Sequence, residues 1–345
     1  MRRLTLALTV AVLVLPAAAS AAAVPVSIFY YPWYGTPDRD GSYQHWAQDG
    51  HLPPGDLAST FYPARGPYSS SDPAVVSAQM REIAAAGIGE VIVSWWGWGS
   101  PEDRRLPLVM QAAEASRLEV AVEIEPYEKW QRTAEVLAAD LAHLRDLGIQ
   151  RVYVFKPFDD LISDASWMAL NQSAGVQMIA QTVDVPRAAA DGFAGVYTYD
   201  ILQYGPSSFE PLCAKARAAH LLCAPSVGPG YDAFRATGDP RSVPRRNGRT
   251  YDAMWKSAIG ARPDRITITS YNEWHEGTQV EAAARHPLRF PSISPTAFQQ
   301  YQTYEGAYGL YGRAARRAYL VRTAFWARAF ALARDVQRVL ALLAG

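Results

Sequence analysis

The sequence predicts an α/β fold, namely a single (β/α)8 barrel (TIM barrel) with long loops at its C-terminal face. Three observations support this: eight strand-like apolar segments recur along the chain, helical patterns separate many of them, and no linker-rich stretch divides the chain. The 345 residues less a 23-residue leader leave 322, a length that suits one large barrel.

The leader has the pattern of a secretory signal peptide. Met1-Arg2-Arg3 is basic, Leu4–Leu15 is apolar, and small residues follow as far as Ala23. The apolar run is shorter than the roughly 20 residues that a membrane-spanning helix needs, and no later stretch is apolar for long enough. We therefore expect a signal peptide at 1–23, a barrel domain at 24–345, export to a periplasmic or extracellular location, and no stable insertion into a membrane.

Each predicted strand is a short apolar or alternating segment. The eight are Val26–Trp33, Glu90–Trp96, Glu119–Pro126, Arg151–Phe158, Val176–Val183, Phe193–Tyr199, Leu221–Ser226 and Arg265–Tyr271. Helical patterns between them cover Asp72–Ala86, Arg104–Arg117, Thr133–Leu147, Ser207–Ala219 and Tyr251–Gly260. The first helix shows the usual boundary signals, with Asp72 as a capping residue before Pro73 and Gly87 after its last turn.

Two further segments complete the predicted barrel. A long helical pattern follows Tyr304, and its apolar stripe is expected to pack on the barrel rather than on a membrane surface; the stripe is Val321, Phe325, Leu332, Val336 and Leu340. The insert Gly35–Ser71 is too long for a simple connection. Its aromatic residues, such as Trp46 and Tyr68, favour a folded loop over the mouth of the barrel.

Charge and cysteine content exclude some partners and leave one question open. Lys and Arg number 33, as do Asp and Glu, and the two signs are interspersed, which argues against a nucleic-acid partner. The chain has only Cys213 and Cys223. Export would permit a disulfide between them, but two buried thiols fit the spacing equally well.

Aromatic, acidic and amide residues gather at the predicted C-terminal ends of the strands, where a barrel enzyme places its site. Flat rings stack on the apolar faces of sugars, and fixed polar groups bind sugar hydroxyls. The pattern therefore predicts a carbohydrate site, and the candidate binding residues are Tyr31, Trp33, Trp96, Glu125, Tyr127, Tyr199, Tyr231, Asn272, Trp274 and His275.

The most specific segment is Asn272–Gln279, where the last strand runs into Glu273 and Glu276. Two carboxyl groups beside aromatic residues are the usual means of cleaving a glycosidic bond, with one group protonated and the other ionised. A plainer interpretation makes one glutamate a helix cap and the other a solvated loop residue. A metallohydrolase using His275 is a further alternative, but the spacing is not HExxH. We expect no metal and no cofactor, and we expect His275 to orient a neighbouring carboxylate.

Several motifs resemble glycoside hydrolase family 99, the endo-α-1,2-mannosidases and endo-α-1,2-mannanases. They are Phe29–Gly35, Phe61–Pro63, Tyr68–Ser70, Ile124–Tyr127, Pro225–Tyr231, Arg246–Gly248 and Asn272–Gln279. The resemblance extends from the first strand to the end of the eighth, and it implies a (β/α)8 barrel as well. The sequence departs from the family pattern after the fourth strand, where Lys156-Pro157-Phe158 stands in place of an acid.

The resemblance also implies a mechanism and a substrate. Glu273 would act as the general base on the 2-hydroxyl of the substrate, which forms a 1,2-anhydro sugar with retention of configuration. Glu276 would be the general acid and then the base. Glu125 would line the substrate site, and Trp96 would lie beside the sugar that precedes the cleaved bond, as in mannan-cleaving members. The implied substrate is α-mannan or a mannose-rich oligosaccharide.

One alternative from another functional class stays open at this point. A non-catalytic carbohydrate-binding protein on a glycosidase-like barrel would keep the aromatic residues but would have no need of both acids. Glu273 and Glu276 are both present, which favours an enzyme.

Overall fold

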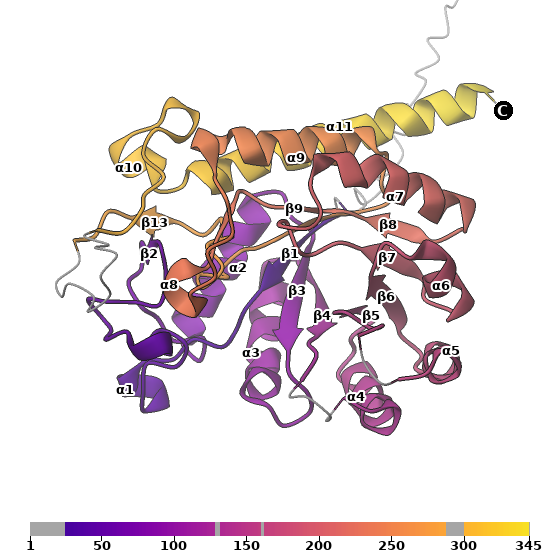
Figure 1. The fold of residues 1–345 in the computed structure, drawn as a ribbon, viewed down its shortest axis with the longest axis horizontal. Coiled ribbons are helices and arrows are strands. Elements are labelled where there is room, and N and C mark those ends of the chain that lie inside the picture. The colour runs from indigo at the N-terminus through magenta and orange to yellow at the C-terminus, as the bar shows by residue number, and fades with distance from the viewer. Residues whose placement is uncertain (1–24, 128–131, 160–161, 288–299, 345) are drawn as a thin grey trace, which may run out of the picture.

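The computed structural model describes residues 25–127, 132–159, 162–287 and 300–344. The signal peptide predicted at 1–23 lies outside these residues. At the centre is a sheet of nine parallel strands in the order β8-β7-β6-β5-β4-β3-β1-β12-β9 (Figure 1). Their bounds are β1 Val26–Tyr30, β3 Glu90–Trp95, β4 Glu119–Ile124, β5 Arg151–Val154, β6 Gln177–Gln181, β7 Gly195–Tyr197, β8 Leu222–Ala224, β9 Ser226–Val227 and β12 Ile266–Ile268.

The two end strands of this sheet, β8 and β9, are consecutive in the chain and only Pro225 separates them. β8 pairs with β7, whereas β9 pairs with β12 on the other side. Proline has no N–H to give to a strand ladder, so the continuous segment is divided at this point. The segment 222–227 therefore joins both edges of the sheet, and the eight predicted strands and the barrel are confirmed.

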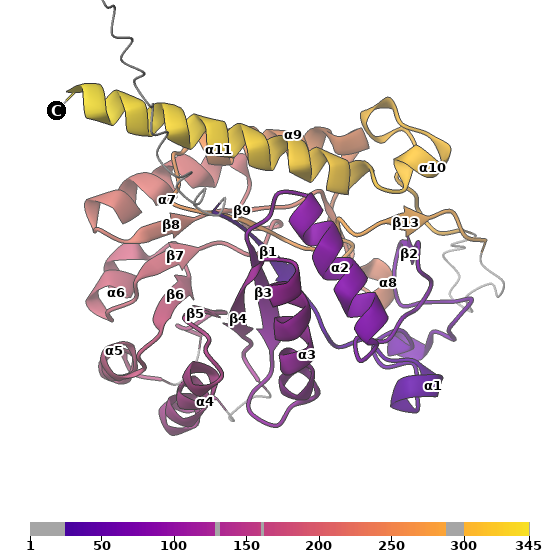
Figure 2. The same ribbon diagram turned by 180° about the vertical axis from the view of Figure 1, so that it is seen from behind.

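The main helices follow the strands and cover the outside of the barrel (Figures 1 and 2). They are α2 Pro73–Ala85, α3 Pro101–Ala115, α4 Ala134–Asp146, α5 Asp164–Ser173, α6 Val185–Ala190, α7 Pro206–Ala218, α9 Arg249–Gly260 and α11 Ala318–Ala344. The loops contain the shorter elements α1 Pro37–Asp40, η1 Gln48–Gly50, β2 Tyr62–Pro63, β10 Tyr231–Asp232, α8 Phe234–Thr237, β11 Ser242–Val243, η2 Arg246–Gly248, β13 Ala283–Ala284, η3 Ala307–Gly309 and α10 Gly312–Ala315.

Side-chain caps fix where several helices begin. The Asp72 carboxylate accepts from the N–H of Ala74, as predicted, and Ser100 caps α3 in the same way through Asp103. α3 therefore begins at Pro101, earlier than the predicted start at Arg104.

The sequence predicts the wrong buried face for the last helix. α11 does lie along the barrel beside α9 and α2 (Figures 1 and 2), but it buries Leu320, Trp326 and Phe330. The predicted stripe is exposed, from 51% at Phe325 to 66% at Leu332. The periodic pattern identifies an amphipathic helix. Apolar residues cover so much of its surface, however, that two faces are candidates for burial. The indole of Trp326 distinguishes them by donating to Asp252. No helix in the described ranges is both long and apolar enough to cross a membrane.

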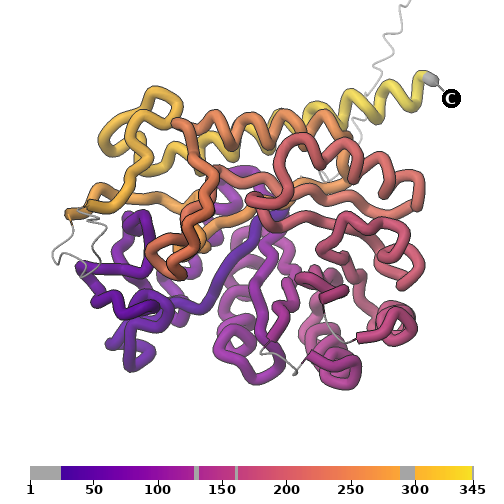
Figure 3. Tube along the Cα trace, viewed as in Figure 1, coloured from indigo at the N-terminus to yellow at the C-terminus, as the bar shows by residue number. Residues whose placement is uncertain are grey.

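The insert 35–71 is folded, as its composition predicts. Trp46 is fully buried against the ring of Tyr34, and its indole N–H donates to the carbonyl of Tyr68. In Figure 3 the insert lies beside the segment around α8. The two are joined by Arg235, which pairs with Asp56. The insert is therefore fixed to the loop that follows β9.

The barrel interior is lined by alternate residues of the strands, because successive side chains of a strand point to opposite faces. Along β1 and just beyond it these are Ser27, Phe29 and Tyr31. The Phe29 ring contacts the rings of Tyr197 and Tyr199 from 5.9 and 5.1 Å, measured between centroids. The same alternation places Glu123 and then Glu125 along β4, toward the C-terminal end of the barrel.

The two cysteines form a disulfide between α7 and β8, with their Cα atoms 5.2 Å apart. This settles the question that the sequence leaves open.

Candidate active site

The C-terminal end of the barrel brings together four glutamates from two places in the chain. Glu123 lies on β4 and Glu125 directly follows it, and Glu273 and Glu276 come from the loop after β12. All four raise the pKa of the Tyr31 hydroxyl by repulsion, in addition to the effect of burial. All four acids therefore act on one tyrosine, which directly follows β1.

Glu273 is held by its own loop. Its N–H donates to the hydroxyl of Ser270, and its Oε1 accepts from the N–H of His275 at 2.9 Å and of Glu276 at 3.4 Å. Burial and the neighbouring Glu276 raise the pKa of Glu273 well above its usual range, whereas the two N–H groups oppose that rise.

Glu276 reaches the site from the same loop but contacts a side chain. The Tyr199 hydroxyl donates to its Oε2 at 3.2 Å, and a short hydrogen bond joins the hydroxyls of Tyr199 and Tyr31. Burial raises the pKa of Glu276 to about 7, with a further contribution from Asp200. Tyr199 and Lys156 act in the opposite direction.

Burial raises the pKa of both Glu273 and Glu276, so this pair gives up its protons at higher pH than free glutamates do. Two interacting carboxyl groups release their protons in separate steps, so one protonated and one ionised group coexist over a range of pH. Burial favours the proton on Glu273, which is 3% exposed, but the two N–H donors favour the charge there. A singly protonated pair provides the combination that acid–base catalysis requires.

Glu125 is the third acid at this end, and it is 7% exposed. The Ser94 hydroxyl donates to its Oε1 at 2.7 Å, and burial raises its pKa to about 7. Below it, Glu123 is fully buried and accepts from the hydroxyl of Tyr197 at 2.7 Å. Burial raises the pKa of Glu123 well above its usual range, followed by repulsion from Glu125.

The predicted aromatic residues occupy different depths. Trp33 is partly exposed and stacks on His45, with ring centroids 4.6 Å apart, while Trp96 is 36% exposed at the end of β3. The partly exposed Tyr231 turns its hydroxyl toward Asp239. Tyr127 is 8% exposed and donates to Asp140, so its hydroxyl is already used within the protein.

Asn272 and Trp274 lie behind the acids, and the expectation of direct substrate contact does not fit them. Both are 0% exposed. The Asn272 amide bonds to the backbone of Tyr31, and the Trp274 indole donates to Tyr68 and Glu281. Their position within the motif is visible in the sequence, but a short loop can turn alternate side chains toward the site or toward the core.

The role expected for His275 also needs correction. Its backbone N–H, and not its ring, contacts the Glu273 carboxylate. Burial lowers the pKa of the ring to about 4, and the ring Nε2 bonds to the carbonyl oxygen of His45. Only an N–H can donate to a carbonyl, so the neutral ring carries its proton on Nε2.

Two supporting residues are absent from the sequence prediction. Arg245 donates to the carbonyls of Gly277 and Gln279 at 2.8 Å each, which fixes the end of the motif. Glu281 is a buried acid two residues beyond the motif. The only sequence signal for Glu281 is its closeness to Gln279, because β12 ends well before it.

Among the described residues, no group of three or more His, Cys, Asp or Glu side chains is placed to hold a metal ion.

Comparison with known protein families identifies the family of this chain. The model of glycosyl hydrolase family 99 matches residues 23–148 and 172–331. The chain belongs to glycosyl hydrolase family 99. Family membership makes it a glycoside hydrolase, so the non-catalytic alternative gives way to an enzyme.

Relatives within family 99 come from distant organisms. A glycoprotein endo-α-1,2-mannosidase-like protein of Danio rerio is 32% identical over 75% of this chain and 71% of its own length. A glycoprotein endo-α-1,2-mannosidase of Xenopus laevis is 32% identical over 74% of this chain and 69% of its own. The solved GH99 endo-α-mannosidase of Bacteroides thetaiotaomicron is 28% identical, with a TM-score of 0.78 over 91% of this chain and 99% of that one.

The family 99 match leaves out residues 149–171, which contain β5 and the departure at Lys156. Lys156 is exposed and its charge lowers the pKa of Glu276. Lys156 therefore lies in a part of the chain that the family model does not cover.

Proposed function

We propose that this enzyme is an endo-acting α-mannoside hydrolase that cleaves internal α-1,2-linked mannosides of α-mannan or high-mannose glycans. The observation that carries the proposal is the placement of Glu273 and Glu276 on one loop, beside the Tyr31–Tyr199 pair, at the C-terminal end of a family 99 barrel. The relatives named above as endo-α-1,2-mannosidases support the choice of linkage.

In the proposed reaction, Glu273 removes the proton of the substrate 2-hydroxyl while Glu276 protonates the departing glycosidic oxygen. The 2-oxygen attacks the anomeric carbon, and the bond to the leaving sugar breaks. Water then opens the resulting 1,2-anhydro sugar, with Glu276 as the base and Glu273 returning its proton to the 2-oxygen. Burial raises the pKa of both acids, and only at Glu273 do two backbone N–H groups oppose that rise, which supports Glu273 as the base; the pKa of Glu276, about 7, supports a group that gives and takes a proton near neutral pH.

We further propose that the partly exposed aromatic residues Trp33, Trp96 and Tyr231 form the sugar-binding platform, with Glu125 among the polar groups. The exposure of Trp96 at the end of β3 supports its place beside the sugar that precedes the cleaved bond. The resemblance to mannan-cleaving members at this position supports mannan as the substrate.

We also propose that the enzyme acts outside the cytoplasm. The leader at 1–23 supports export. The Cys213–Cys223 disulfide is of a kind that persists in oxidising compartments. N-terminal sequencing of the mature protein from culture medium and periplasm tests this, and an unprocessed N-terminus in the cytoplasm contradicts it.

Product analysis tests the central proposal. The enzyme is incubated with α-1,2-branched α-1,6-mannan and, in parallel, with a glucosylated high-mannose oligosaccharide, and the released sugars are sized by mass spectrometry. We expect oligosaccharides rather than free mannose, with faster release from the mannan. No release from either substrate, or release of mannose alone, would contradict an endo-acting mannosidase.

A further inference from the structure

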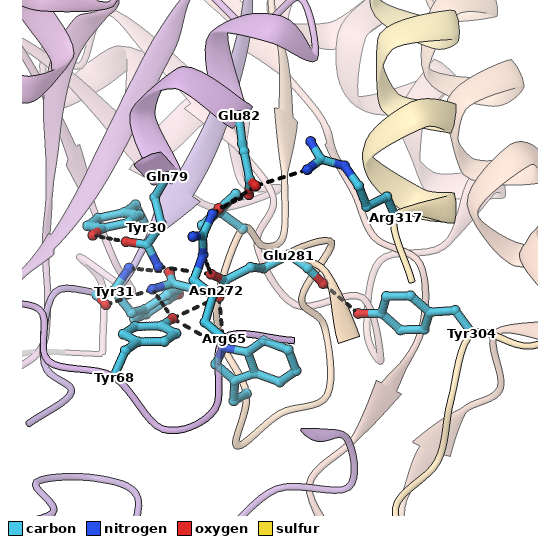
Figure 4. A network of polar contacts seen from close by, with 12 residues as sticks. Tyr30, Tyr31, Arg65, Tyr68, Gln79, Glu82, Asn272, Glu281, Tyr304 and Arg317 are labelled. Carbon is cyan, nitrogen blue, oxygen red and sulfur yellow. Dashed lines mark hydrogen bonds and ion pairs between the residues drawn. The ribbon is translucent and has the colours of Figure 1, made fainter. Parts of the chain in front are cut away.

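A buried carboxylate outside the proposed acid–base pair lies behind the motif. Glu281 is 1% exposed, and both of its oxygens have partners (Figure 4). Oε1 accepts from the Gln79 amide at 3.0 Å and lies 3.4 Å from Nε of Arg65. Oε2 accepts from the Tyr68 hydroxyl at 2.8 Å and from the Trp274 indole at 3.1 Å.

These contacts lead to both neighbours of Glu273. Trp274 follows Glu273 and bonds to Glu281 directly. Asn272 precedes Glu273 and donates to the Tyr68 hydroxyl at 3.2 Å. Because the Tyr68 proton is used at Glu281, its oxygen is free to accept from Asn272. One carboxylate therefore holds the residues on either side of the proposed base.

The same connection continues toward Glu276. Asn272 bonds to both the N–H and the carbonyl of Tyr31, at 2.8 and 3.0 Å. The Tyr31 hydroxyl joins that of Tyr199, which donates to Glu276. A shift at Glu281 would thus be transmitted to the groups around both acids through a continuous series of hydrogen bonds.

We propose that Glu281 is a positioning residue of this enzyme, which fixes Asn272 and Trp274, and through them Glu273, without touching the substrate. The proposal rests on the function proposed above for Glu273 and Glu276. The four groups that contact the Glu281 carboxylate are all hydrogen-bond donors; they belong to Gln79, Arg65, Tyr68 and Trp274. A carboxylate accepts from all of them, whereas an amide carries its own N–H groups and must turn some of them toward other donors.

A purely structural role is the competing explanation, and the network contains a matched control. Glu82 on α2 shares Arg65 with Glu281, at 2.8 Å, and also pairs with Arg317 (Figure 4). It bonds to Tyr271 but to neither Asn272 nor Trp274 in the contacts of the described residues. Glu82→Gln therefore removes a similar charge from the same network and leaves the flanks of Glu273 intact.

The test compares Glu281→Gln, Tyr68→Phe and Glu82→Gln with the wild type on α-mannan oligosaccharides, well below each melting temperature and above pH 7, where Glu281 is ionised. We expect kcat to fall about 10- to 100-fold in the first two variants, because a displacement of a reacting group by about 1 Å costs rate on that scale. KM should stay within about threefold, since the sugar contacts are unchanged. Glu82→Gln should keep the wild-type kcat even if it unfolds at a lower temperature.

The double variant Glu281→Gln/Tyr68→Phe should lose no more than the worse single variant, because both changes break one connection. A wild-type kcat in Glu281→Gln, or an equal loss in Glu82→Gln, would overturn the proposal. If Glu281→Gln does not fold, a wild-type kcat in Tyr68→Phe overturns it instead. An inactive wild type would count against the proposed function and not against this role. The fluorescence of Trp274, obtained as the difference between each protein and its Trp274→Phe variant, should still change on Glu281→Gln and not on Glu82→Gln.

Discussion

The two ends of the barrel interior both contain buried glutamates, but in opposite surroundings. At the N-terminal end, Glu90 is 1% exposed and pairs with Arg151 and Arg265, and it also accepts from Ser27 and Tyr153. At the C-terminal end, Glu125, Glu273 and Glu276 receive hydroxyl or N–H donors, and the described residues include no cation paired with them.

The difference separates a stabilising site from a reactive one. The Glu90 carboxylate is held in place by two guanidinium groups. Acids that repel one another in a buried setting have raised pKa values, so they can hold and release protons near neutral pH.

The largest effect should follow from removing an acid at the reactive end. We expect Glu273→Gln and Glu276→Gln each to lower kcat by about 100- to 10,000-fold, the range that a general acid or base contributes. Calorimetry should show that both variants still bind the oligosaccharide, because the aromatic platform is intact. Neither variant should melt below the wild type, since each removes a repulsive charge. Full activity in either one would contradict the assigned roles.

The same substitution at the other end should act on stability instead. Glu90→Gln leaves Arg151 and Arg265 without their buried partner, and breaking such a pair costs about 3–5 kcal/mol. Urea unfolding measures the loss, and kcat per folded molecule should be unchanged. A variant with wild-type stability and a reduced kcat would erase the distinction between the two ends.

The pH dependence of stability sharpens the comparison through Glu281. Burial raises its pKa from 4.5 to about 7, against the opposing influence of Gln79, Arg65 and Tyr68. The folded protein then binds this proton more tightly than the unfolded chain. The stabilisation is therefore complete below pH 4.5 and is lost as the pH rises through about 7.

That shift corresponds to about 3 kcal/mol for Glu281 across this window. We expect the free energy of unfolding to fall between pH 5 and pH 8, and Glu281→Gln should flatten the slope while Glu82→Gln should not. Chemical denaturation at several pH values provides the measurement. If the free energy of unfolding depends on pH in the same way in both variants, a group other than Glu281 binds the proton.

The sequence predicts the barrel well because each strand is a local pattern. Eight apolar segments and their helix caps can be identified without tertiary information, and the motif at Asn272–Gln279 marks the end of the last strand. The error in α11 arises where the pattern is ambiguous, because Leu320 and Trp326 compete with Val321 and Phe325 for the buried face.

The site is less predictable because its contacts join distant segments. Nothing local indicates that Glu281 meets Tyr68, from which it is separated by 213 residues. Nor can the sequence tell which residues of a short loop face inward: Glu276 points to the site, whereas Trp274 points to the core. Such orientations are decided by packing against the insert and α2.

The disulfide should produce the smallest of these effects, and it belongs to the stabilising end. Cys223 lies on β8, and its backbone N–H bonds to Asp264 close to the start of β12. Closing a loop of 10 residues stabilises a fold by about 2–3 kcal/mol. We expect Cys213→Ala/Cys223→Ala, and equally the wild type reduced with dithiothreitol, to unfold at lower urea concentration with kcat unchanged. The reduced wild type keeps both sulfur atoms, so it separates loss of the bond from loss of volume. A fall in kcat on reduction would mean that the constraint on β8 extends to Glu276, and the two ends would then not be independent.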